Sequence, residues 1–179
     1  MSEIETLTTK IVYENKWMKV REDSIRRANG AEGIYGVVDK PDFVAIIPVQ
    51  EGIIHLVEQF RYPVSDRYWE IPQGSWESDP NADPIAVAAG ELREETGLHA
   101  NKFTYVGHLY QAYGYSNQGF HVYIATELNI SAQDLEVEEQ GLITRGFSVD
   151  EFESKIISGV IKDATTITAY GLAKLKNLV

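Results

Sequence analysis

The sequence predicts an α+β fold, built as an αβα sandwich with a β-rich extension at its N-terminus. Three observations support this: β-rich runs come first, one helix carries strong start and stop signals, and the later strands are mixed with a few helices. This order favours a sandwich over a regularly alternating parallel sheet. With 179 residues and 44% apolar content, the chain is long enough to bury a core of its own.

Residues 1–39 are predicted to form the N-terminal β-rich segment, and residues 40–179 the main domain. A turn at Asn29-Gly30, whose residue types tolerate positive φ, is expected between strands of the segment. No repeat or low-complexity tract divides the remainder. The short strands expected in the segment are 10–13, 17–25 and 34–38.

The main domain is expected to open with a β-hairpin whose two strands are joined by Glu51-Gly52. Both strands are apolar enough to be central in a sheet. Later strands are indicated where β-branched and aromatic residues recur between Gly and Asn. The predicted strands are 43–49, 53–61, 69–71, 103–110 and 120–128.

One helix is signalled more strongly than any other, from Pro84 to Thr96. Asp83 is a good N-cap, proline is favoured at the first helical position, and Gly97 is a typical C-terminal cap.

Two further helices are expected near the C-terminus. Ser148 and Glu151 match a capping box, with Phe147 placed to pack against Phe152 as a hydrophobic staple. A last helix is expected to begin at Asp163. Apolar or small residues at spacings of three and four predict its buried face as Ala164, Ile167, Gly171, Leu175 and Leu178.

The charge balance excludes several kinds of partner. Sixteen basic and 27 acidic residues give a net charge of −11, which repels nucleic acids and anionic membranes at long range. There is no cysteine, so a metal must be held by Asp, Glu, His or backbone oxygens. Without a signal-like start or an apolar run long enough to span a bilayer, a cytoplasmic protein is expected.

Three carboxylates occupy one face of the predicted helix. Glu91, Glu94 and Glu95 stand at positions i, i+3 and i+4, so their side chains lie within reach of a common ion. Taken alone, such a cluster is more often a solvated acidic face, since charged residues are mostly exposed.

The surrounding sequence changes this interpretation. The segment 71–74 (Ile-Pro-Gln-Gly), a loop, and then 88–98 (AAGELREETGL) resemble the Nudix box, G-x5-E-x7-R-E-U-x-E-E-x-G-U. The resemblance implies a Nudix-type sandwich with a mixed sheet, in which two or more Mg²⁺ or Mn²⁺ ions are held at the site. The implied metal-binding residues are Glu91, Glu94, Glu95 and the backbone carbonyl of Gln73.

The chain departs from this pattern at two points. Gly90 replaces the usual arginine, either through neutral drift or because another group packs closely against it. The loop from Gly74 to Glu91 is two residues longer than the motif prescribes, so the loop glutamate of the box has no unambiguous counterpart. Its candidates are Glu77, Asp79 and Asp83.

The flanking segments resemble the ADP-ribose pyrophosphatase branch of the family. The run 56–63 (LVEQFRYP) carries a Q-x-R element, which implies that Arg61 contacts substrate phosphate, although an ordinary ion pair is the alternative. The run 69–74 (WEIPQG) resembles an E-x-P-x-G entry to the box. There Glu70 is either a substrate contact or the partner of a nearby arginine.

Two loops are implied to complete the site. Tyr115 and Ser116 lie where relatives place a loop near the sugar and phosphates, although a tyrosine-rich loop can equally pack on itself. Glu138 and Glu139 lie where relatives carry an acidic loop that supplies a catalytic base, the alternative being a solvated turn. Trp17 and Trp69 could each stack a base or fill a core, and core packing is expected for Trp69.

The predicted function is metal-dependent hydrolysis of the diphosphate bond of a nucleoside diphosphate sugar, with ADP-ribose favoured. GDP-mannose or a dinucleoside polyphosphate is the alternative substrate, and a catalytically weak sensor of nucleotide sugars is the alternative function. The expected partners are a small-molecule substrate, with no nucleic acid and no membrane, and a second copy of the chain. The resemblance implies the homodimer, because similar N-terminal segments form dimers in ADP-ribose pyrophosphatases, and the short strands need partners for their backbone groups.

Overall fold

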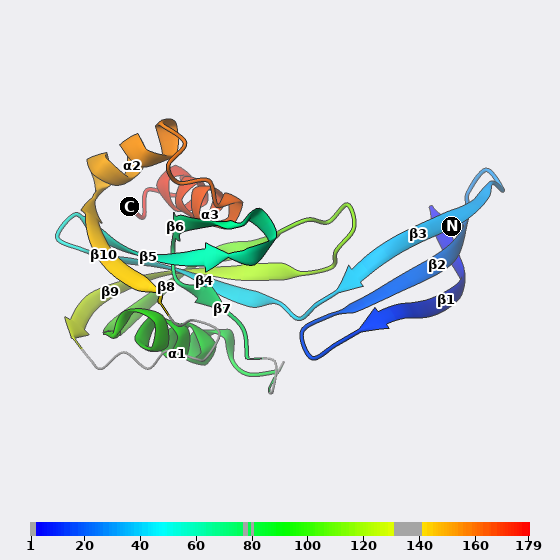
Figure 1. Ribbon diagram of the computed structural model, residues 1–179, viewed down its shortest axis with the longest axis horizontal. Helices are drawn as coiled ribbons and strands as arrows, with labels where there is room; N and C mark the ends of the chain where they lie inside the picture. Colours follow the sequence, from blue (N-terminus) through cyan, green and yellow to red (C-terminus); the bar gives the residue numbers. More distant parts are fainter. Residues whose placement is uncertain (1–2, 77–78, 80, 131–140) are drawn as a thin grey trace.

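The main domain is a three-layer sandwich in which helices cover both faces of a mixed sheet (Figure 1). The computed structural model describes residues 3–76, 79, 81–130 and 141–179. Helix α1 (Pro84–Thr96) lies on one face, and α2 (Val149–Ile157) and α3 (Ala164–Leu175) lie on the other. The predicted α+β sandwich with an N-terminal β-rich extension is confirmed. No helix among the described residues is long and apolar enough to cross a membrane.

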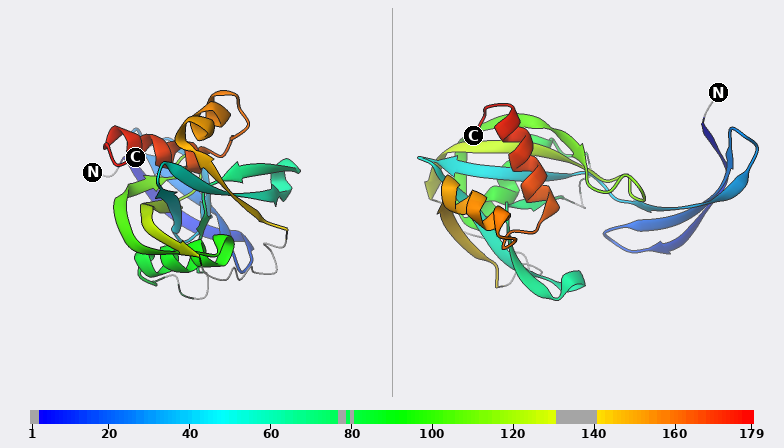
Figure 2. Two further views of the ribbon diagram at one scale, coloured as in Figure 1. Left: turned by 90° about the vertical axis from the view of Figure 1, so that its left-hand side faces the viewer. Right: turned by 90° about the horizontal axis from the view of Figure 1, so that it is seen from above.

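The N-terminal extension is a separate antiparallel sheet that projects away from the sandwich (Figure 2). Gly30 adopts φ +85° in the turn before its last strand, as the Asn-Gly pair predicts. Its first strand begins earlier than expected from the sequence. The strands are β1 (Ile4–Glu14), β2 (Lys19–Arg27) and β3 (Glu32–Asp39), with β2 in the middle.

The large sheet has the strand order β10-β5-β4-β9-β8, with β6 added beside β5 and β7 beside β4. Strands β4 and β9 are parallel, whereas the other pairs are antiparallel, which makes the sheet mixed. The predicted hairpin is present, with Glu51 and Gly52 at positive φ in its turn. The strands are β4 (Phe43–Gln50), β5 (Ile53–Arg61), β6 (Asp66–Glu70), β7 (Gln73–Gly74), β8 (Leu98–Tyr110), β9 (Gly119–Ile130) and β10 (Ile143–Ser148).

Strand β4 is buried on both faces, which explains its nearly continuous apolar sequence. Phe43, Ala45 and Ile47 belong to the core beneath α2 and α3, whereas Val44 and Ile46 belong to the core beneath α1. Alternate side chains of this one strand therefore join both layers of the sandwich.

Helix α1 has the bounds that the local sequence predicts. The Asp83 carboxylate accepts a hydrogen bond from the Ile85 amide, and Gly97 ends the helix in the left-handed conformation. Val87, Ala88 and Leu92 pack on the sheet, so the helix is fixed by burial as well as by its caps.

Helix α2 also begins as predicted, because the Ser148 hydroxyl accepts from the Glu151 amide and both Phe147 and Phe152 are buried in one core.

The predicted buried face of α3 is only partly correct, because Ile167 packs partly buried against the core whereas other predicted members are exposed. Ala164 is exposed and Leu175 is 84% exposed. The buried residues are two threonines, Ala169, Tyr170 and Ala173. Two of the polar side chains are paired, because Thr166 donates to Asp163 and Tyr170 donates to Glu153, so they can be buried.

Candidate active site

A cavity of about 1220 Å³ lies between the sheet, α1 and the start of α3. Its lining combines acids, cations and aromatic rings contributed by both parts of the chain. The charged lining residues are Lys16, Lys40, Arg61, Glu70, Glu91, Glu95, Lys162 and Asp163, and the aromatic ones are Trp17, Phe43, Phe60, Tyr62, Tyr68 and Trp76.

Two of the three predicted helix acids face this cavity. Glu91 and Glu95 are 6% and 1% exposed, although they belong to a helix whose outer face is in water. One turn apart on α1, they share the face that looks toward β7. Two buried carboxylates this close together need cations or hydrogen-bond donors around them, and they form a group of oxygen atoms suited to a divalent cation.

Gly74 makes the close approach of α1 possible. A Cβ atom at this position would lie 2.3 Å from Oε2 of Glu91 and 2.7 Å from its Oε1. The neighbouring amide of Gln73 donates a 3.2 Å hydrogen bond to Oε2 of Glu95. The backbone of β7 therefore positions both carboxylates. The motif has glycine at position 74 because a side chain there would collide with Glu91.

Glu94 lies to the side of this pair. It is absent from the described cavity lining, and its Oε1 accepts a 3.1 Å bond from Arg93. Its carboxylate is 22% exposed.

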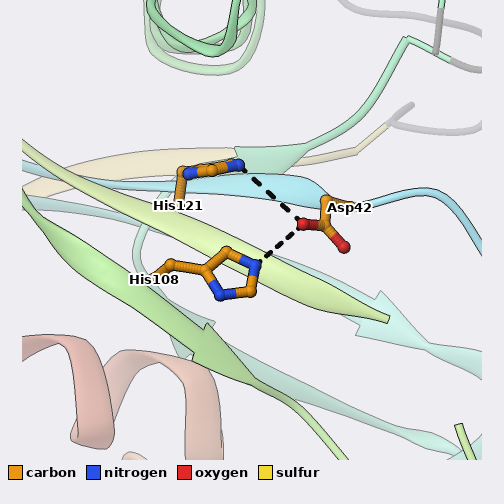
Figure 3. A group of neighbouring side chains, drawn as sticks. All are labelled: Asp42, His108 and His121. Carbon is orange, nitrogen blue, oxygen red and sulfur yellow. Dashed lines mark hydrogen bonds and ion pairs between the residues drawn. The ribbon is translucent and has the colours of Figure 1, made fainter. Parts of the chain in front are cut away.

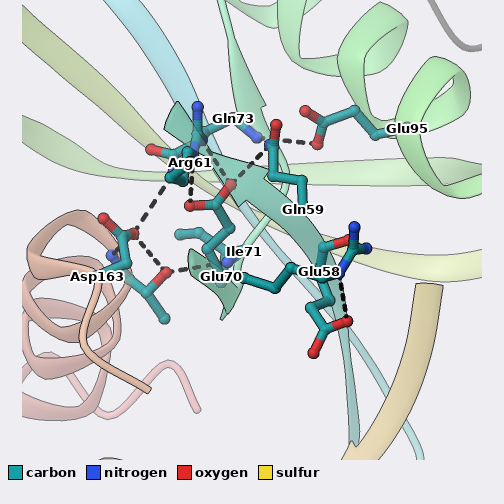
Figure 4. A network of polar contacts seen from close by, with 10 residues as sticks. Glu58, Gln59, Arg61, Glu70, Ile71, Gln73, Glu95 and Asp163 are labelled. Atoms are coloured by element: carbon teal, nitrogen blue, oxygen red, sulfur yellow. Dashed lines mark hydrogen bonds and ion pairs between the residues drawn. The ribbon is translucent and has the colours of Figure 1, made fainter. Parts of the chain in front are cut away.

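A buried network joins β5 to β6 (Figure 4). Glu70, 2% exposed, accepts hydrogen bonds from Gln59 (2.7 Å) and from Nε (3.2 Å) and Nη2 (2.5 Å) of Arg61. Burial raises the pKa of Glu70, and the charge and hydrogen bonds of Arg61 oppose this effect only in part. Glu70 is thus paired with an arginine, which is one of the two roles considered from its sequence, and both residues of the pair line the cavity.

Asp163 connects α3 to the same network. Its Oδ2 accepts from the Thr166 amide at 2.8 Å, which caps the helix, and from the side-chain amide of Gln73 at 3.4 Å. The Thr166 hydroxyl in turn accepts from the Ile71 amide at 2.9 Å. This chain of bonds fixes the segment 71–74 between α1 and α3.

The oxygen donors around β7 suit a hard divalent cation. Glu91, Glu95 and Gln73 all line the cavity, and carboxylate and carbonyl oxygens are the ligands that magnesium and manganese prefer. The residues present therefore fit the metal that the sequence predicts.

Tyr115 and Ser116 are placed elsewhere. The Tyr115 carbonyl accepts from the Val38 amide at 2.7 Å, and the Ser116 hydroxyl donates to the Val38 carbonyl at 3.0 Å. These contacts attach the β8–β9 loop to β3, and neither residue belongs to the described cavity lining. From the same loop region, Gln111 and Gln118 line the cavity instead.

The two tryptophans take different roles. Trp69 packs edge-on against Phe147 in the core, with ring centroids 5.0 Å apart, as expected. Trp17, between β1 and β2, is 45% exposed and lines the cavity. The N-terminal sheet therefore reaches the site of the main domain through this residue.

The close-packing explanation holds for Gly90. A Cβ there would lie 2.5 Å from Cζ2 of Trp76, whose ring lies over the helix where the motif usually has arginine. Of the acids proposed for the motif's loop position, Asp79 is exposed and Asp83 caps α1. Glu77, like Glu138 and Glu139, lies outside the described residues.

Gln59 and Asp163 have positions in the site that were not assigned from sequence, whereas Trp17 was left between stacking a base and filling a core. Gln59 belongs to the Q-x-R element, so that motif contained a signal for it. Asp163 was recognised only as the start of a helix, because its contact with Gln73 spans 90 positions.

Known proteins resemble the chain over nearly its whole length. A NUDIX domain model matches residues 40–166, and a nucleoside diphosphate sugar hydrolase N-terminal domain model matches residues 4–38. An ADP-ribose pyrophosphatase of Bacillus subtilis (strain 168) is 28% identical over 97% of this chain and 94% of its own length. An ADP-ribose pyrophosphatase of Mycobacterium tuberculosis is also 28% identical, over 92% of this chain and 80% of that protein.

A methanol dehydrogenase activator of Bacillus methanolicus is 27% identical over 97% of the chain and 94% of its own length. The crystal structure of an ADP compounds hydrolase superposes with a TM-score of 0.86 at 19% identity, covering 100% of this chain and 98% of that one. This likeness supports the fold.

The contact between Gly90 and Trp76 predicts opposite effects of one substitution in two backgrounds. Gly90→Ala should lower the free energy of unfolding of the wild type, because the new Cβ displaces the indole. In a Trp76→Ala background the same change should raise it by about 1 kcal/mol, the helix propensity difference between the residues. Urea unfolding of the four proteins measures both effects, and equal signs in the two backgrounds would contradict the packing explanation.

The raised pKa of Glu70 predicts a pH-dependent stability. The folded protein binds this proton more tightly than the unfolded chain, so the stabilisation is complete below the ordinary glutamate pKa. It is lost as pH rises through the raised pKa. The wild type and Glu70→Gln are therefore compared without divalent metal. The free energy of unfolding of the wild type minus that of the variant should fall as pH rises from the ordinary to the raised pKa. A difference that rises with pH would refute the assignment.

Proposed function

Because the chain belongs to the Nudix family, as a pyrophosphohydrolase of the ADP-ribose pyrophosphatase-like kind, we propose that it hydrolyses ADP-ribose to AMP and ribose 5-phosphate. The observation that carries this proposal is the pair of buried carboxylates, Glu91 and Glu95, held against β7 and facing a cavity that also contains cations. Nudix hydrolases are generally dependent on divalent metals, and this donor set fits that chemistry.

Magnesium or manganese, as two or more ions, would neutralise the diphosphate oxygens and lower the pKa of water when bound. Glu91, Glu95, Glu94 and the Gln73 carbonyl are the proposed ligands. Glu94 reaches the site by releasing its bond to Arg93, which at this partly exposed position costs little.

Arg61 is proposed to contact substrate phosphate. Its Nε and Nη2 donate to the buried Glu70, which fixes the plane of the guanidinium while the side chain remains 41% exposed. A guanidinium fixed in this way presents its remaining donors to an anion with little loss of side-chain entropy. Lys16, Lys40 and Lys162 add positive charge to the same cavity.

The two ends of the substrate need different surroundings. Trp17 offers an exposed aromatic face to a nucleobase, and stacking of this kind tolerates either adenine or guanine. GDP-mannose therefore remains the competing substrate. Tyr115 and Ser116 stay candidates for the sugar end, where closing of the β8–β9 loop is required for contact.

The reaction adds water to one phosphorus and breaks the bridging P–O bond. One product phosphate keeps the bridging oxygen, the other gains the oxygen of water, and a base accepts the proton. Glu138 and Glu139 are the proposed bases. Both lie outside the described residues, so the proposal for them comes from the sequence alone.

We also propose a homodimer formed through the N-terminal sheet. Strands β1 and β3 are edge strands, and their apolar side chains are exposed to an extent unusual for a small sheet. These residues are Ile4, Ile11, Val12, Tyr13, Ile34 and Tyr35. Two such surfaces together would bury the apolar area that one chain leaves in water.

Product release tests the activity. With magnesium, the protein should convert ADP-ribose to AMP and ribose 5-phosphate faster than it cleaves GDP-mannose or diadenosine polyphosphates, measured by ion-exchange chromatography. Glu95→Gln should lose most turnover while remaining folded, because the neutral amide binds a hard cation poorly. Glu127→Gln is the matched control. Near wild-type rates for Glu95→Gln at limiting magnesium would reject the metal assignment, and faster cleavage of another substrate would reject ADP-ribose.

One member of the acidic pair should act as the base. A general base contributes about 10²- to 10⁴-fold, whereas a solvated acid contributes almost nothing. We therefore expect one of Glu138→Gln and Glu139→Gln to lower kcat by at least about a hundredfold with little change in KM. Normal kcat for both variants would move the role to Glu77 or Glu70.

The dimer is tested by a charge placed on the apolar surface. Ile34, 67% exposed on β3, becomes buried in the proposed dimer, so Ile34→Lys should shift the protein toward monomer in sedimentation at micromolar concentration. Ile157→Lys, at a site 86% exposed on α2, is the control and should leave the dimer intact. A monomeric wild type would contradict the proposal.

A further inference from the structure

A second group of metal-ligating side chains lies at the end of the sheet where the N-terminal segment joins the domain (Figure 3). His108 of β8 and His121 of β9 are directly opposite each other in the antiparallel ladder. Asp42 immediately precedes β4, whose parallel pairing with β9 places Val44 opposite His121. The three residues therefore come from three adjacent strands and meet on the α1 side of the sheet, where His121 lines a smaller cavity with Val87 of α1.

The geometry of this group fits a single small cation. Oδ2 of Asp42 lies 2.8 Å from Nε2 of His108 and 3.8 Å from Nε2 of His121. One ligand atom from each residue lies within 4.8 Å of the others. Tetrahedral zinc, with bonds of about 2.0–2.1 Å, holds its ligand atoms roughly 3.3 Å apart. The two distances from Oδ2 of Asp42, 2.8 and 3.8 Å, lie on either side of that spacing.

The backbone holds the carboxylate in position for this role. The Gly119 amide donates a 2.8 Å hydrogen bond to Oδ1 of Asp42, which leaves Oδ2 directed at the two imidazoles. Gly119 also makes room for a ring, because a Cβ there would lie 2.3 Å from Nε2 of His108. A hydrogen bond that orients a ligand from behind is typical of built metal sites.

We propose that Asp42, His108 and His121 bind a zinc-type divalent ion, with water completing the coordination. Two imidazole nitrogens and one carboxylate oxygen suit zinc, whereas magnesium prefers oxygen ligands alone. The site is distinct from the carboxylate cavity: none of its three residues belongs to that cavity's described lining. Asp42 and His121 line the smaller cavity instead, about 350 Å³, and Phe43 and Trp76 stand between the two.

The position of the site suggests its effect on the protein. Asp42 ends the short connection from β3 to β4, which is already held to the β8–β9 loop by two hydrogen bonds. Gln118 donates to the Pro41 carbonyl at 2.9 Å, and the Lys40 amide donates to the Asn117 side chain at 3.1 Å. A metal ion would tie this connection to β8 and β9 as well. Zinc should therefore stabilise the junction between the two sheets, because a ligand that binds only the folded state stabilises it.

Zinc titration of the full chain tests the proposal. Calorimetry is run with excess magnesium, so that the carboxylate cavity is already supplied with its preferred ion. The wild type should bind one equivalent of zinc at this site, and its melting temperature should rise. His121→Gln and Asp42→Asn should weaken zinc binding by at least about a hundredfold and lose the rise, since ligand loss exceeds the effect of an outer partner.

The controls separate this site from the others. His99→Gln, an exposed histidine on the same strand as His108, should bind zinc as the wild type does. Asp42→Asn keeps an acceptor for the Gly119 amide, so its fold, checked by circular dichroism, should be preserved even if His121→Gln unfolds. Absence of tight zinc binding, equal binding by Asp42→Asn, or loss of zinc in Glu95→Gln instead would each overturn the proposal. Failure of ADP-ribose turnover would leave this result unaffected.

Discussion

The close approach of α1 to the backbone of β7 is the constraint on which the site depends. It requires Gly74, because any side chain there would occupy the position of the Glu91 carboxylate. It also places Glu95 where the Gln73 amide can donate to it. Buried acids are stable only where hydrogen-bond donors or positive charges compensate them, so this contact groups oxygen atoms of the kind that a divalent cation binds. The apolar residues on the rest of the helix supply the packing that holds these acids in place.

The departure from the usual motif at Gly90 follows from the same packing. With Trp76 lying against the helix, a larger residue at this position would have no room. The indole also lines both cavities, so it separates the carboxylate pair from the group around His121. The uncharged indole of Trp76 thus fills the space beside the loop that the arginine fills in the usual motif.

Local signals predicted the elements that depend on local interactions. The caps of α1 and the Glu51-Gly52 turn act within a few residues, and both are found as predicted. The two-residue strand β7 was too short for any periodicity to indicate. The buried face of α3 was predicted only in part, because Thr166 and Tyr170 are buried through partners distant in the chain. Asp163 shows the same limit: the helix that starts there was predicted, but the contact of Asp163 with Gln73 was not.

The N-terminal sheet buries too little apolar surface to account for its own stability. Ile25 is the only apolar residue that its described strands bury, and a three-stranded sheet with so small a core is marginal in water. Contacts with the main domain supply part of the missing stability. Val38 forms hydrogen bonds with the β8–β9 loop, and Asp39 accepts a hydrogen bond from Asn117 at 2.9 Å. These bonds lie at one end of the sheet and leave its apolar surface uncovered. The dimer proposed above would bury that surface, and the same strands would then support both assembly and the position of Trp17 at the cavity.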